Sequence, residues 1–172
     1  MSIEYFSDEL IDILKKRDYS QFWFHDLGNG YRFAHCFLYA NDKADDVEVH
    51  VTAHDNTISE EMTDRVIDVL EHLDECIQRA YVWLSKQNLY DEWFTKPYYS
   101  PQEHAQLFTV DVLDFREAGS EPGSPNPTGG AFVMSFFMDY TTLPPGSYYP
   151  HKYDVWFHYD NLQPYKSEKG IW

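Results

Sequence analysis

The stretch EVHVTAHD, residues 48–55, has the residue types that metal-binding or acid–base chemistry requires. Glu48, His50 and His54 share one face of a strand, because residues two apart in a strand point to the same side. Two imidazoles and a carboxylate are suitable ligands for zinc or non-haem iron. However, His50 and His54 are four residues apart, which is roughly 13 Å along a strand. One ion therefore cannot bind both at bond lengths of about 2 Å.

An ion on Glu48 and His50 needs further ligands from neighbouring strands. His35 is one candidate, and His158 with Asp160 near the end of the chain is another. Nothing in the sequence brings these residues together. The alternative is a solvated polar face on a strand whose other face is rich in valine, and this interpretation is favoured. The sequence thus predicts no metal ion and no other cofactor, with Glu48, His50 and His158 kept as the candidate ligands.

A nucleophilic site is the second chemical hypothesis. The residue types of a triad are present in His25, Asp26, Cys36, His104 and Ser135. None of them lies in a GxSxG motif, and Cys36 falls inside the apolar run YRFAHCFLYA, where burial raises the pKa of a thiol. The sequence also lacks glycine-rich phosphate loops. We therefore assign no catalytic residue, and a metal-dependent enzyme that uses the Glu48/His50/His54 face is kept as an alternative.

Strands and helices must position these residues. Alternating and apolar runs predict strands at 20–26, 31–40, 47–54, 107–115, 131–140 and 153–160. A short helix begins at Ser7, and one long helix begins near Thr57 or Ser59 and continues to Leu84. The predicted fold class is α+β: a mainly antiparallel sheet of about six strands, with the long helix packed on one face and the short N-terminal helix beside it. Residues 1–172 are predicted to form a single domain.

The charge balance and the cysteines restrict the class of partner and the compartment. The chain has 29 acidic and 13 basic residues, a formal net charge of −16, which repels nucleic acids and anionic membranes. Such an excess suits a cationic partner or solubility alone. Cys36 and Cys76 have neither metal-binding nor disulfide spacing, which indicates a reducing compartment. No signal peptide and no apolar run long enough for a membrane span are visible. We expect a cytoplasmic protein that binds neither nucleic acid nor membrane.

The predicted binding surface combines a row of carboxylates with aromatic residues in loops. Four residues of the long helix recur at spacings of four, three and four, and form what we call the acidic ridge: Asp64, Asp68, Glu71 and Glu75. Aromatic residues near prolines supply rigid contacts: Trp93, Tyr98, Tyr99, Tyr148 and Tyr149. A solvated helix face is the alternative interpretation of the ridge. Together the two features predict a docking surface for a basic protein.

The order of the predicted strands and helices resembles that of a known group of protein domains. It comprises the strand meander, TISEEMTDRVIDVLEHLDECIQRAYVWLSK as a single long helix, and a last strand with the motif VWFHYDNLQP. In these features the chain resembles small acidic bacterial domains of unknown function, several of which are proposed immunity proteins of polymorphic-toxin systems. The resemblance implies a non-enzymatic inhibitor that occludes a basic toxin encoded beside it. A small-ligand or structural module is the remaining alternative.

Overall fold

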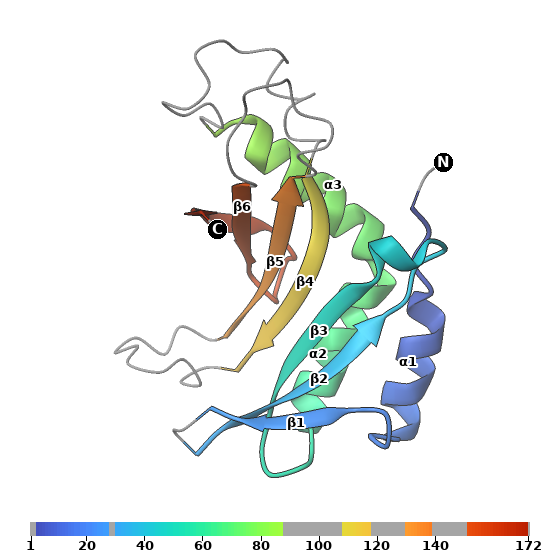
Figure 1. Ribbon diagram of the computed structural model, residues 1–172. Helices are drawn as coiled ribbons and strands as arrows, with labels where there is room; N and C mark the ends of the chain where they lie inside the picture. Colours follow the sequence, from blue (N-terminus) through green and yellow to red (C-terminus); the bar gives the residue numbers. More distant parts are fainter. Residues whose placement is uncertain (1–2, 28–29, 88–107, 118–129, 139–150, 172) are drawn as a thin grey trace.

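The computed structural model describes residues 3–27, 30–87, 108–117, 130–138 and 151–171 (Figure 1). The fold is α+β, as predicted. The helices in these ranges are α1 (Ser7–Lys16), the 3₁₀ helix η1 (Lys43–Asp45), α2 (Glu60–Glu71) and α3 (Leu73–Ser85). The strands are β1 (Trp23–Asp26), β2 (Arg32–Leu38), β3 (Val47–Ala53), β4 (Phe108–Arg116), β5 (Ala131–Met138), β6 (His151–Phe157) and β7 (Pro164–Ile171). None of the described helices combines the length and apolar composition of a membrane span.

The strands form one mixed sheet in the order β1-β2-β3-β4-β5-β6-β7. Every neighbouring pair is antiparallel except β3 and β4, which are parallel. Parallel neighbours require a crossover connection, and the chain between β3 and β4 contains α2 and α3. The first three strands form the predicted meander. The sheet has one strand more than the predicted six, within the described residues.

The additional strand is β7, whose sequence PYKSEKGI lies beyond the last predicted strand at 153–160. It pairs with β6 at the edge of the sheet. Charged residues such as Lys166, Glu168 and Lys169 interrupt any apolar alternation along it. Edge strands are commonly charged in this way, because charges discourage pairing with other chains. The strand is therefore held by its backbone pairing and gives no hydrophobic signal in the sequence.

The prediction of one long helix is wrong, because the helix breaks at His72. The His72 backbone has φ −116° and ψ 23° and ends α2. Its ring Nδ1 donates a hydrogen bond of 2.8 Å to the Asp68 carbonyl, which in a continuous helix accepts the His72 backbone N–H. That N–H donates to Val69 instead, at 3.1 Å. Competition from the side chain thus replaces one α-helical bond and separates α2 from α3.

One face of the sheet packs on the helices. Alternate residues of β2 and β3 are buried there, such as Cys36 and Val49, in the same core cluster as Leu14 of α1 and Val66 of α2. Ser59 caps α2, since its Oγ accepts from the Met62 backbone N–H at 3.2 Å. Figure 1 shows α2 and α3 behind the strands that they cover. The other face, which we call the open face, carries the intervening residues.

Two rows of side chains cross the open face because the strand registers align them. The first row contains Trp23, His35, His50, Asp114, Val133, Trp156 and Lys166. The second row contains Phe37, Glu48, Val112, Ser135, Asp154 and Glu168. Each row takes one residue from each strand that it crosses. The registers therefore place in one line side chains that lie up to 143 positions apart in the sequence (from position 23 to position 166).

Candidate functional sites

The first candidate site is a cluster of His35, Glu48 and His50 on the open face, which we call the histidine cluster. His35 is the direct cross-strand partner of His50, and Glu48 precedes His50 by two residues on β3. Residues two apart on a strand share a face, and cross-strand partners have Cβ atoms roughly 4.5–5.5 Å apart. The strand pairing therefore brings the three side chains to one place.

The cluster converges on one carboxylate oxygen. Glu48 Oε2 lies 3.4 Å from His50 Nε2 and 3.8 Å from His35 Nε2. One possible ligand atom from each residue lies within 4.8 Å of the other two. His35 and His50 have side chains 21% and 27% exposed, against 46% for Glu48. Glu48 therefore lies on the solvent side of the cluster.

Burial affects the protonation of His35. Desolvation lowers the pKa of His35 below its ordinary value, and the neighbouring His50 lowers it further, against the opposing effect of Glu48. Both effects favour the neutral imidazole. Aromatic rings surround the cluster: the Phe37 ring centroid lies 5.2 Å from that of His35, and the Phe33 centroid 5.0 Å from that of His50.

The other predicted metal ligands lie apart from the cluster. His54 Nε2 is 2.6 Å from Glu117 Oε2, so His54 already has a close carboxylate partner. His158 stacks on Tyr165 with ring centroids 4.1 Å apart. The structure thus joins His35, rather than His54 or His158, to Glu48 and His50. The signal in the sequence was the alternation of Phe33, His35 and Phe37, but only the register of β2 and β3 places His35 opposite His50.

The second candidate site is an acidic groove between the N-terminal segment and the junction of α2 with α3. It has a volume of about 640 Å³. Its lining residues are Ile3, Glu4, Tyr5, Ser7, Asp8, Leu70, Glu71, His72, Leu73, Asp74 and Glu75. Five of these are carboxylates, and no lysine or arginine is among the eleven described lining residues. The groove therefore presents negative charge from two walls.

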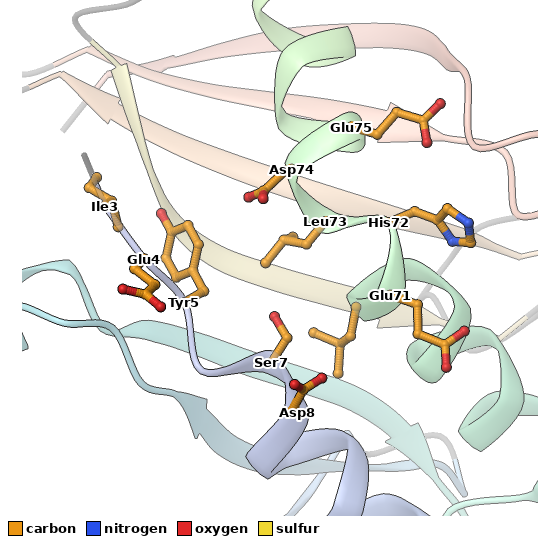
Figure 2. Close-up of a pocket in the computed structure, with 11 residues that line it drawn as sticks. Ile3, Glu4, Tyr5, Ser7, Asp8, Glu71, His72, Leu73, Asp74 and Glu75 are labelled. Atoms are coloured by element: carbon orange, nitrogen blue, oxygen red, sulfur yellow. The ribbon is translucent and has the colours of Figure 1, made fainter.

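Figure 2 shows how the groove residues point. Glu71, His72 and Glu75 extend to one side of the helix junction, and Asp74 extends to the other side, toward Tyr5. The pKa of Tyr5 is raised by burial first, and by Tyr81, Asp45 and Asp74 after it. The groove is not visible in the sequence, because its walls come from segments about 65 residues apart.

His72 is the titratable base of the groove. Its hydrogen bond to the Asp68 carbonyl raises its pKa, and the nearby carboxylates of Asp68, Glu75 and Glu71 raise it further. The Asp68 Oδ1 atom lies 3.4 Å from His72 Nδ1. The protonated form of His72 is therefore stabilised. Its charge opposes the negative charge of the groove when the pH falls.

The acidic ridge is exposed, but it is divided between two helices. Asp64, Asp68 and Glu71 lie on α2, whereas Glu75 lies on α3. Glu75 accepts a hydrogen bond of 2.5 Å from Arg79, which partly neutralises it. Glu71 and Glu75 also line the groove. The predicted aromatic contacts Trp93, Tyr98, Tyr99, Tyr148 and Tyr149 lie outside the described residues.

The residues considered for a nucleophilic site do not form a triad in the described part of the chain. Burial raises the pKa of the Cys36 thiol to about 12. The sequence had predicted that burial raises this pKa. Ser135 Oγ donates to Asp154 Oδ1 at 2.6 Å, with Lys152 Nζ 3.5 Å from the same oxygen. The Ser135 hydroxyl is therefore bound to a carboxylate beside a lysine.

Comparison of the chain with protein-family models, with curated proteins and with solved structures gives no match. The resemblance to immunity domains therefore stays a prediction from the order of elements.

Proposed function

We propose that the chain is a non-enzymatic binding protein that occludes a basic partner protein through the acidic groove and the adjoining acidic ridge. The observation that carries the proposal is a groove lined by Glu4, Asp8, Glu71, Asp74 and Glu75, with no lysine or arginine among its described lining residues. Like charges held close together repel each other. A cationic side chain in the groove relieves that repulsion.

The size and charge of the groove indicate the kind of contact. A volume of about 640 Å³ accommodates a few side chains and not a folded domain. Lysine or arginine side chains of a partner fit both that volume and the charge. The net charge of −16 adds a field of the same sign around the molecule. Such fields increase association rates with cationic partners.

The biological setting that we propose is that of an immunity protein for a basic toxin. The support is the resemblance in the order of elements and the acidic surface. Both cysteines are free and buried, as is usual for proteins in a reducing compartment, which supports a cytoplasmic location. The first partners to test are the products of genes adjacent to the gene of this protein.

Three matched variants test the proposal. The groove variant carries Glu4→Gln, Glu71→Gln and Asp74→Asn, and the ridge variant carries Asp64→Asn and Asp68→Asn. The control variant removes three exposed charges elsewhere by Asp26→Asn, Asp55→Asn and Asp160→Asn. Candidate partners are purified, and their association and dissociation rates are measured by surface plasmon resonance at low and physiological salt.

We expect the groove variant to lower the association rate by about 3- to 10-fold at low salt and to weaken its salt dependence. The control variant changes the net charge by the same amount and should have a smaller effect. Equal rates for the wild type and the groove variant would overturn the groove as the binding surface. A lower rate in the ridge variant alone would assign binding to the ridge instead.

A pH series adds a second test through His72. Its pKa is raised, so lowering the pH through that pKa adds a positive charge beside the groove. The association rate should therefore fall as the medium is acidified from pH 8 toward pH 6. In a His72→Gln variant this fall should be smaller, because the side chain no longer titrates. An unchanged pH profile would mean that His72 does not face the bound partner.

A further inference from the structure

We propose that His35, Glu48 and His50 form a binding site for one divalent transition-metal ion on the open face of the sheet. The proposal concerns a different site from the acidic groove and does not depend on the proposed function. It also departs from the expectation of no metal, because the sequence alone did not show that His35 lies beside Glu48 and His50.

The backbone arrangement supplies three ligand atoms without any change of fold. Glu48 lies two positions before His50 on β3, and His35 faces His50 across the β2–β3 pair. Central strands hold their register firmly, since a slip of one residue would turn buried valines to the open face. The relative positions of the three residues are therefore fixed by the core on the other side of the same strands.

The distances suit a single ion. Two donors bound to one ion at about 2.0–2.2 Å in tetrahedral geometry lie roughly 3.3–3.6 Å apart. Glu48 Oε2 is 3.4 Å from His50 Nε2 and 3.8 Å from His35 Nε2. The three ligand atoms all lie within 4.8 Å of one another, so side-chain adjustments without a change of the backbone are enough to bring them around one ion. The same oxygen faces both imidazoles, so one ion can contact all three groups.

The second observation is a buried atom without a hydrogen bond. His35 Nε2 is inaccessible to solvent and has no hydrogen-bond partner among the described residues. Its 3.8 Å separation from Glu48 is too long for a hydrogen bond. Leaving a buried polar atom unpaired destabilises the folded protein. A bound metal ion would satisfy this nitrogen, because a neutral imidazole coordinates through its unprotonated atom.

His54 provides the contrast on the same strand region. Its Nε2 lies 2.6 Å from Glu117 Oε2 and its side chain is 51% exposed. A histidine with that partner has its polar atom satisfied. The histidine cluster instead has longer separations and a less exposed pair of rings. The difference indicates a site that is completed by a ligand.

The ligand set selects the class of ion. Imidazole suits zinc, iron, cobalt, nickel and copper, whereas calcium and magnesium prefer oxygen ligands. Phe33 and Phe37 flank the histidines and limit water on that side. The solvent side at Glu48 leaves room for a water molecule or another small ligand as the fourth ligand.

The test uses Co²⁺ and Zn²⁺ with the purified full-length chain after removal of any metal by a chelator and dialysis. Co²⁺ binding is followed by its visible absorption, and Zn²⁺ affinity by isothermal titration calorimetry. The variants are His35→Gln, Glu48→Gln and His50→Gln, with His54→Gln as the matched control. Circular dichroism and thermal melting of each metal-free variant establish that it is folded.

We expect one ion to bind per chain, with the Co²⁺ spectrum of a nitrogen- and oxygen-liganded site. Each cluster variant should lose affinity by more than about tenfold, because even loss of an outer-shell partner costs about 10- to 100-fold. His54→Gln should bind as the wild type does. No binding of either ion at micromolar concentration would overturn the proposal. Unchanged affinity in folded His35→Gln and His50→Gln variants, or loss of binding in His54→Gln, would do so as well.

Discussion

The two rows of side chains on the open face differ between their N-terminal and C-terminal ends. On β1 to β3 they carry Trp23, which is 57% exposed, and the histidine cluster with its unpaired His35 nitrogen. On β4 to β6 they carry Trp156, which is only 9% exposed, and polar groups that bind one another. Asp154, for instance, accepts from Ser135 at 2.6 Å.

This difference distinguishes a part of the sheet whose polar groups stabilise the fold from a part that is suited to bind a ligand. Polar side chains that satisfy each other need no further partner, and they contribute to stability. Polar side chains that are desolvated but unpaired reduce stability unless a ligand completes them. The C-terminal part of the open face is therefore structural. The N-terminal part is where we expect a ligand.

The largest expected effect concerns the back of β2, where Cys36 lies between His35 and Phe37 but points into the core. Burial raises its pKa from 9.0 to about 12. The thiolate fraction near neutral pH should therefore fall about a thousandfold, and with it the reaction with a thiol reagent such as DTNB. The measurement compares the labelling rate of folded and urea-unfolded protein in a Cys76→Ala variant. Rapid labelling of the folded protein would mean that solvent reaches the core side of β2 as well as its open face.

The next largest effect is expected when the losses of stability on replacing Trp156 and Trp23 are compared. Trp156→Ala should destabilise the protein by about 3–5 kcal/mol, because it opens a cavity beside Val133 and Ala131. Trp23→Ala should cost about 1 kcal/mol or less, since the ring is largely exposed. Urea denaturation of both variants gives the two values. Similar losses of stability in the two variants would mean that the N-terminal and C-terminal parts of the open face do not differ in this way.

The polar groups provide a third comparison. Asp154→Ala leaves the buried Ser135 hydroxyl without its acceptor and should cost about 1–3 kcal/mol. Glu48→Gln in the metal-free protein should change the free energy of unfolding by less than about 0.5 kcal/mol. Both are measured by urea denaturation in the presence of a chelator. A large loss in Glu48→Gln under those conditions would make the histidine cluster a structural element.

The strand pattern of this chain was predictable where one face is buried. The alternation of Val47, Val49 and Val51 with polar residues correctly predicted β3 and placed Glu48 and His50 together on its other face. The helix starting at Ser7 was predicted from its first-turn acids and last-turn lysines. These features depend on neighbours in sequence. A single sequence therefore contains enough information to find them.

The sites depend on contacts that no local pattern specifies. The pairing of His35 with His50 follows from the β2–β3 register, and the acidic groove follows from the packing of the N-terminal segment on the helix junction. The helix break was hidden because an apolar stripe continues across it through Leu70 and Leu73. The hydrogen bond from the His72 side chain to the Asp68 carbonyl, which competes with the helix at this point, is seen only in the structure.

The smallest expected effect lies at the C-terminal end of the first row, where the Lys166 ammonium sits 4.5 Å from the centroid of the Trp156 ring. Lys166 also forms an exposed ion pair with Glu168 at 2.9 Å. Lys166→Met keeps most of the aliphatic stem over the ring and removes the charge. It should destabilise the protein by about 0.5–1 kcal/mol, the range for an exposed cation–π contact.

Glu168→Gln separates the ion pair from the cation–π contact, because it removes the carboxylate and leaves the cation over Trp156. Its cost should be at most about 0.5 kcal/mol, as for other exposed ion pairs, and it should vanish at high salt. The loss in Lys166→Met should persist when salt is added, since the ring and the ammonium are in direct contact. If both losses disappear together in urea denaturation at 1 M NaCl, the ion pair alone explains the effect of Lys166. The tryptophan is then held by its contacts with Val133 and Ala131, and the C-terminal end of the row remains structural through packing rather than through charge.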